Sequence, residues 1–102
     1  MDFRIIKSPS EGTRRVLKRR IGIENKEVLL TADAIGLVQG KLIDMIYAID
    51  IAEKAAGVIV EDIKGSCPQH LISIAILGDT TSVEAAIIEI KSKLKLKEVM
   101  SL

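Results

Sequence analysis

Two side chains that can do chemistry lie three positions apart: Cys67, the only cysteine, and His70, the only histidine. A thiol beside an imidazole is the arrangement in which a cysteine serves as an activated nucleophile. Such a site also needs a group that orients the histidine and donors for an oxyanion, and two side chains flanking a Pro-Gln pair do not supply these. We therefore expect no enzyme active site, and a nucleophilic Cys67 is the weakest functional hypothesis.

A metal cluster is the second chemistry that Cys67 suggests. One thiolate cannot hold an iron–sulfur cluster, because these clusters are usually bound by several cysteines. Cyclic symmetry would change this, since subunits whose Cys67 loops meet at an axis would supply a ring of thiols. The simpler interpretation, a small apolar side chain in a turn, is the usual setting of a free cysteine, and composition alone favours it. The sequence contains no Walker lysine motif, dinucleotide glycine fingerprint or zinc-finger spacing.

Cys67 belongs to the segment Gly65-Ser66-Cys67-Pro68-Gln69, which separates two apolar runs. A plain hairpin between two strands would favour a short turn rich in glycine or asparagine. A Cys-Pro pair after a glycine is an unusual choice for that purpose. We infer that a requirement other than chain reversal selects these residues.

The composition limits the partners and the location of the protein. The chain has 102 residues, of which 48% are hydrophobic and 28% charged, with a net charge of +1. This balance predicts one domain with no general attraction to nucleic acid or membranes. No apolar run approaches the roughly 20 residues of a membrane span. The first residues lack the pattern of a signal peptide, and one cysteine cannot form an internal disulfide, so we expect a cytosolic protein with a free thiol.

Hydrophobic periodicity and capping signals predict the elements that position the Cys67 loop. Strands are expected at 3–7, 34–39, 58–64 and 70–77, and helices at 8–20, 41–56 and 81–94. Ser8, followed by Pro9 and Glu11, is the predicted start of the first helix, and Thr81 with Glu84 is the predicted start of the last. Residues 23–33 are expected to form a linker with strand character at 28–30, and residues 95–102 are left unassigned.

The element order predicts an α+β fold. From residue 34 onward it is strand, helix, strand, strand, helix, which is a ferredoxin-like unit without its last strand. The strand at 3–7 can fill the vacant place in the sheet, so we expect a circularly permuted, mostly antiparallel sheet with helices packed on it. Gly36 indicates a close approach to a backbone. The strand at 70–77 is apolar on both faces, which is typical of a central or covered strand.

Two surfaces point to contacts outside the chain. The helix at 41–56 is apolar on more than one side, so one side can face the sheet and the other a neighbouring subunit. The helix at 8–20 carries a basic cluster, Arg14–Arg20. This cluster is either a patch that binds anions or nucleic acid or, as the charge balance favours, a solvated face.

Residues 34–94 resemble the bacterial microcompartment shell domain. Ala34-Ile35-Gly36-Leu37-Val38 is similar to its opening strand, and Ala48–Ala56 to its first helix. Ile63-Lys64-Gly65-Ser66 resembles the approach to its pore loop, and Gly78-Asp79 with Val83-Glu84-Ala85-Ala86 resembles the turn and final helix. The resemblance implies that Lys54 is the lysine at the edge between hexamers.

The strand and helix at 1–22, placed before the core at 34–94, resemble the circularly permuted hexameric members of that family, which implies one permuted shell domain over 1–102. The segment 8–33 is too short for the extra strand that caps the pore in some permuted members. Gly65-Ser66-Cys67-Pro68-Gln69 fits a Gly-x-Cys-Pro-Gln pore motif. This motif is similar to that of shell proteins from glycyl-radical propanediol microcompartments, whose pore cysteines bind an iron–sulfur cluster.

The resemblance implies a non-enzymatic subunit of a bacterial microcompartment shell in the cytoplasm. It would form a homohexamer that tiles with other shell proteins. Cys67 would ligate a cluster, expected to be 4Fe-4S, shared by several subunits at the pore, for electron transfer or pore occlusion. Gly65 and Ser66 would let the backbone approach the axis, Pro68 would stiffen the loop and Gln69 could hydrogen-bond the loop or the cluster. The alternatives are a hexamer whose pore passes small polar metabolites without a cluster, and a ferredoxin-like ligand-binding regulatory oligomer.

Overall fold

The structure is a computed structural model that describes residues 1–22, 26–65 and 71–100. In chain order the elements are β1 (Asp2–Lys7), α1 (Glu11–Arg20), α2 (Lys26–Thr31), β2 (Ala34–Lys41), α3 (Leu42–Ala55), β3 (Ile59–Ile63), β4 (Leu71–Gly78) and α4 (Thr80–Met100). The four predicted strands and three predicted helices are all present. A further helix, α2, was not expected.

The strands of the described residues form one antiparallel sheet in the order β1-β2-β4-β3. Phe3 pairs with Val38, which in turn pairs with Ile74 on the other side. This is the strand order of a ferredoxin-like unit whose last strand comes from the front of the chain instead of the end. The structure therefore confirms the α+β fold and the permuted order.

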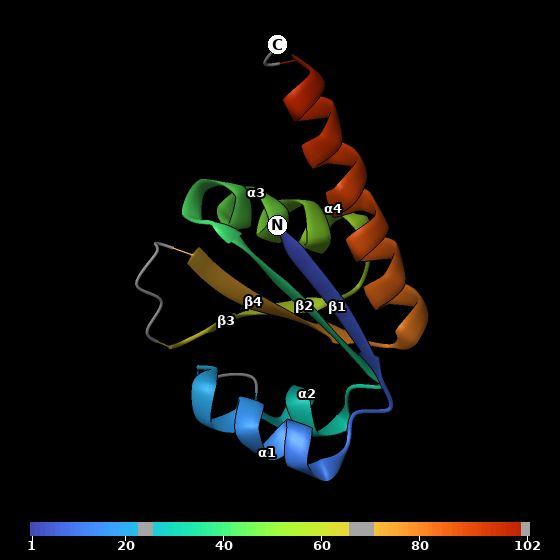
Figure 1. Ribbon diagram of the computed structural model, residues 1–102. Coiled ribbons are helices and arrows are strands. Elements are labelled where there is room, and N and C mark those ends of the chain that lie inside the picture. The colour runs from blue at the N-terminus through green and yellow to red at the C-terminus, as the bar shows by residue number, and fades with distance from the viewer. Residues whose placement is uncertain (23–25, 66–70, 101–102) are drawn as a thin grey trace.

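Helices cover both faces of the sheet, with α3 and α4 on one face and α1 and α2 on the other (Figure 1). Each face has its own apolar core. In β4, Ile74 and Ile76 face α3 and α4, whereas Ala75 and Leu77 belong to the core beneath α1 and α2. Successive side chains of a strand point to opposite faces, so a strand buried on both sides is apolar throughout. The prediction of a covered central strand at 70–77 is confirmed.

Gly36 lies where α4 crosses β2. A Cβ atom at this position would lie 2.8 Å from Cδ1 of Ile87 and 3.1 Å from Cγ1 of Val83. Real Cβ atoms do not come within 3 Å of another carbon, so the absence of a side chain lets the helix pack directly on the strand. The close approach expected at Gly36 is confirmed.

The first helix begins later than predicted, because Ser8 does not cap it. Ser8 has φ of 47°, in the left-handed region, and its N–H donates to the carbonyl of Asp33 at 2.8 Å. An N-cap residue needs an extended backbone, which Ser10 has, and the Ser10 hydroxyl accepts the N–H of Thr13. Ser8 is instead the residue that turns the chain out of β1.

The linker with strand character predicted at 23–33 is wrong for its described part, because residues Lys26–Thr31 form α2. Leu29 is fully buried in the core between this helix and the sheet. A short apolar run such as 28–30 has the same pattern in a buried helix and in a strand, so tertiary packing decides between them.

The start of the last helix also differs from the prediction. The carboxylate of Asp79, through Oδ1, accepts the N–H of Ser82 at 2.8 Å, so Asp79 and not Thr81 caps α4. Glu84 lies instead 3.7 Å from the ammonium group of Lys7, measured to its carboxylate oxygen. The helix continues past the predicted end at 94 to Met100. Within the described residues no helix is both long and apolar enough to cross a membrane.

Candidate functional site

The predicted pore residues Ser66, Cys67, Pro68 and Gln69, together with His70, lie outside the described residues, and the roles assigned to them stay predictions. The structure does place both ends of this segment. Gly65 follows β3 by two residues, and Leu71 begins β4. Because β3 is one of the two edge strands of the described sheet and pairs with β4, the segment that carries the only cysteine joins an edge strand to its neighbour.

The C-terminal end of α1 lies against the base of this loop. The Lys64 N–H donates to the carbonyl oxygen of Arg20 at 2.6 Å. A Cβ atom on Gly65 would lie 3.2 Å from Nη1 of Arg20, so the end of this arginine side chain lies beside the base of the loop. No sequence pattern connects positions 20 and 64, because their contact depends on how α1 packs across the sheet. Sequence reasoning therefore placed Arg20 only in the basic cluster.

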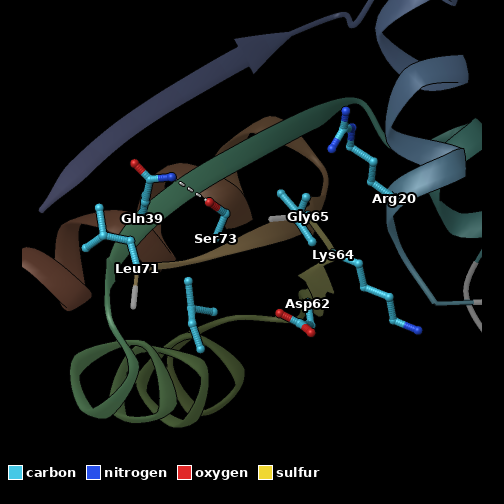
Figure 2. Close-up of a pocket in the computed structure, with 9 residues that line it drawn as sticks. Arg20, Gln39, Asp62, Lys64, Gly65, Leu71 and Ser73 are labelled. Atoms are coloured by element: carbon cyan, nitrogen blue, oxygen red, sulfur yellow. Dashed lines mark hydrogen bonds between the residues drawn. The ribbon is translucent and has the colours of Figure 1, made fainter. Parts of the chain in front are cut away.

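A cavity of about 470 Å³ opens beside Gly65. Arg20 borders it from α1 and Gln39 from β2, and β3, β4 and the ends of the loop complete its walls. The side-chain amide of Gln39, through Nε2, donates to the hydroxyl of Ser73 at 2.9 Å. Figure 2 shows this bonded pair on one side of the cavity, Arg20 on another, and Gly65 between them. Sequence analysis singled out only Gly65 and the basic cluster among these residues.

Lys54, the predicted hexamer-edge residue, lies in the last turn of α3 and is exposed. Its ammonium group lies 2.9 Å from Oδ2 of Asp50, one helical turn earlier. The hydrogen bond and the negative charge of Asp50 raise the pKa of Lys54 above its usual value of 10.5. The side chain thus has a partner within its own subunit, and the edge contact stays a prediction.

The second apolar side of α3 is present in the structure. Four large side chains on this helix are between 38% and 67% exposed: Leu42, Ile43, Ile46 and Tyr47. Other residues of the helix, such as Met45 and Ala48, are buried against the sheet. A contiguous exposed apolar surface of this kind is typical of a protein interface. It is the face that the sequence predicted to meet a neighbouring subunit.

Arg14 has a structural role in the basic cluster, and the other cations of the cluster are exposed. Arg14 donates from Nη1 to the carbonyl of Leu29 at 2.8 Å and from Nε to the carbonyl of Pro9 at 3.2 Å. It thereby ties α1 to α2. The remaining cations of the cluster are exposed: Arg15, Lys18, Arg19 and Arg20. Of these, only Arg20 borders the cavity.

Within the described residues, no three His, Cys, Asp or Glu side chains come together in a way that could hold a metal ion. The single thiol of the chain lies in the loop segment. Because the chain has one cysteine, an iron–sulfur cluster would need thiolates from several subunits, and the cluster stays a prediction.

The family model for the BMC domain matches residues 34–102. The ligand-free structure of the GrpU microcompartment shell protein from Clostridiales bacterium 1_7_47FAA is 49% identical, covers 93% of each chain and has a TM-score of 0.72. The ligand-free GrpU shell protein from Pectobacterium wasabiae is 34% identical over 88% of this chain and 99% of that chain, with a TM-score of 0.71.

The fused permuted hexameric shell protein MSM0275 from the RMM microcompartment has the same fold. It is 21% identical over 92% of this chain and 45% of that chain, with a TM-score of 0.72. No curated protein matches this chain.

These similarities confirm the prediction of a microcompartment shell protein. Shell proteins of this family are structural, so the predictions of a non-enzymatic protein located in a microcompartment shell are confirmed. The shell assignment also replaces the alternative of a regulatory oligomer. The cluster and the pore motif stay predictions. With its family match over residues 34–102 and its 49% identity to a solved shell protein, this chain belongs to the BMC-domain family of bacterial microcompartment shell proteins.

Proposed function

We propose that the chain forms a homohexameric shell tile whose pore-lining Cys67 residues hold an iron–sulfur cluster shared by several subunits. The observation that carries this proposal is the position of the only cysteine. It lies in the segment between Gly65 and Leu71 at the edge of the sheet in a BMC-domain chain. Six copies arranged about an axis would bring six thiols together, where one chain has one.

The surface of the single chain supports assembly. Its accessible surface is 6574 Å², compared with about 5,700 Å² from the size scaling for a monomer of 11.1 kDa. The exposed apolar side chains of α3 form part of this surface. Burial of apolar area at about 25 cal/mol per Å² would favour association, although ordering the subunits offsets part of that gain.

The charges at the base of the loop also suit a cluster. A 4Fe-4S cluster bound by thiolates is negatively charged, and each subunit carries Arg20 and Lys64 where the described chain approaches the loop. Cys67 would be the ligand, and Gly65 and Ser66 would allow a close backbone approach. The bound cluster would accept or donate one electron, or occlude the pore. Six thiolates exceed the four that one such cluster takes, so only some subunits would ligate it.

Pro68 and Gln69 would shape the loop. Pro68 has a restricted φ and would stiffen the segment next to the thiol. Gln69 could donate its side-chain amide to a backbone carbonyl of the loop or to a cluster sulfur. Lys54, at the end of α3, would serve the contact between neighbouring hexamers and other shell proteins.

The cluster is tested by anaerobic purification and iron–sulfur reconstitution of the protein beside its Cys67→Ser variant. The wild-type protein should show broad absorbance in the visible range and an EPR signal after reduction. The variant should show neither. Native mass spectrometry should give six subunits for both proteins. A colourless wild-type hexamer after reconstitution would rule out the cluster but leave the shell tile intact.

A second function, a pore that passes small polar metabolites without a cluster, is favoured by the cations beside the loop. Arg20 and Lys64 would attract negatively charged solutes to the pore region. A colourless hexamer that increases the permeability of an assembled shell to a small carboxylate would support this function. The same flux should fall in an Arg20→Gln variant.

A further inference from the structure

We propose that the cavity beside Gly65 binds a small organic anion, with Arg20 receiving its carboxylate and the Gln39–Ser73 pair receiving a hydroxyl group at its other end. The lining residues on which this proposal rests belong to one chain and to its described part, and Cys67 is not among them. The proposed anion site therefore goes beyond the proposed cluster.

The positive end of the cavity is provided by Arg20 and Lys64. Two backbone hydrogen bonds hold this end in place. The Arg20 carbonyl accepts the Lys64 N–H, and at the end of α1 the Leu17 carbonyl accepts the Ile21 N–H. Neither side chain forms an ion pair within the described part of the chain. A guanidinium group offers two parallel N–H donors that match a carboxylate, which makes Arg20 the anchor and Lys64 a second source of positive potential.

Asp62 is the charge that opposes an anion in this cavity. It is an exposed residue of β3 that lines the cavity together with the two cations. Among the described residues of the lining, two side chains are positive and one is negative. This charge balance favours an anion. Replacing Asp62 tests the sign of the charge on the ligand.

The other end of the cavity can bind a hydroxyl group. Gln39 donates its amide N–H to Ser73, so the Ser73 oxygen accepts that bond while its own proton stays available. The carbonyl oxygen of the Gln39 amide can act as a further acceptor, since no hydrogen bond to it is formed within the described residues. Both residues are half-buried, so these groups are partly shielded from water and would gain from a ligand that pairs with them.

Three apolar side chains also belong to the described lining of the cavity. Ile63, Leu71 and Ile72 line the cavity, and their side chains suit a short hydrocarbon segment. A ligand with a carboxylate, a few methylene groups and a distal hydroxyl would match the cations, the apolar side chains and the Gln39–Ser73 pair. The chemical class is therefore a short hydroxycarboxylate.

Isothermal titration calorimetry with three probes that share a four-carbon chain tests the proposal on the full chain: 4-hydroxybutyrate, butyrate and 1,4-butanediol. The expected order of affinity is hydroxybutyrate, then butyrate, then the diol, with about a tenfold loss for the missing charge. Tighter binding of the diol than of either acid would overturn the proposal. Absence of binding for all three probes would overturn it as well.

Four variants locate the site. Arg20→Gln should lower the affinity for hydroxybutyrate about tenfold, whereas Arg19→Gln, an exposed arginine beside it that does not line the cavity, should leave the affinity unchanged. Ser73→Ala should remove the difference between hydroxybutyrate and butyrate. Asp62→Asn should strengthen the binding of both acids, because it removes a like charge.

Equal effects of the two arginine variants, or weaker binding in Asp62→Asn, would contradict the site. A colourless protein that binds hydroxybutyrate would reject the cluster and retain this site. A protein that holds a cluster but binds no probe would reject this site alone.

Discussion

At the scale of single residues, Asp79 determines where α4 begins, because its carboxylate accepts the N–H of Ser82. Replacement by alanine removes this acceptor, and we expect Asp79→Ala to lower the free energy of unfolding by about 1 kcal/mol. Urea denaturation followed by circular dichroism measures the change. Thr81→Ala is the control, and its smaller effect would confirm the assignment. An equal loss in both variants would contradict it.

Lys54 gives a prediction of pH dependence at the same scale. Its pKa is raised by Asp50, so its folded-state pKa exceeds the unfolded value near 10.5. The stabilisation from this pair is therefore fully present below pH 10.5 and is lost as the pH rises through the folded-state pKa. Near neutral pH the contribution does not change with pH.

An NMR titration of the Lys54 side chain can test this assignment. Asp50→Asn should lower the pKa of Lys54 toward 10.5, because it removes the negative charge and weakens the hydrogen bond. Glu53→Gln, next to Lys54 in sequence and absent from this ion pair, should leave the pKa unchanged. A fall of similar size in both variants would show that general surface charge, and not Asp50, sets the pKa.

At the scale of elements, the contact of α4 with β2 depends on the lack of a side chain at Gly36. Gly36→Ala would place a methyl group 2.8 Å from Cδ1 of Ile87, and we expect a loss of about 1–3 kcal/mol in the free energy of unfolding. Ile87→Val removes Cδ1, so the penalty of Gly36→Ala should shrink in the double mutant. Thermal denaturation of the four proteins in this cycle measures the coupling.

Gly57 supplies the matched control for this prediction. A Cβ atom there meets nothing within 4 Å, and its φ is not positive, so Gly57→Ala should be neutral or slightly stabilising. A penalty for Gly36→Ala that stays the same with Ile87→Val would mean that Val83 or the strand backbone, and not Ile87, limits the space.

At the scale of the whole molecule, the exposed side of α3 is the expected contact between subunits. Ile43 is 67% exposed in the single chain, so Ile43→Asp should change the stability of the isolated fold by no more than about 0.5 kcal/mol. In the hexamer the same carboxylate would be desolvated without a partner, and the assembly should dissociate. Native mass spectrometry should show monomers or small oligomers.

Val16→Asp is the control for this prediction, since Val16 is an exposed apolar residue of α1 on the opposite face of the sheet. This variant should stay assembled. A hexamer that survives Ile43→Asp would place the subunit contact elsewhere on the chain. Dissociation in both variants would show that any new surface charge disrupts the assembly.

Much of the fold was predictable because its signals are local. The apolar run at 70–77 and the helical pattern at 41–56 depend on neighbours in sequence, and the strand order followed from the order of the elements. The caps at Ser8 and Thr81 were wrong for a related reason. Several polar residues near each helix start can serve as a cap, and the path of the incoming chain selects among them.

The sequence by itself determined the composition, the element order and the single thiol at a loop between two strands. The element order predicted a permuted α+β fold, and the resemblance of residues 34–94 to the microcompartment shell domain implied the family. The tertiary structure alone decided that residues 26–31 are helical, because Leu29 is buried beneath the sheet. It also brought Arg20 to Lys64 and Gln39 to Ser73. Contacts between residues distant in sequence depend on how helices pack across a sheet, and hydrophobic periodicity carries no record of that packing.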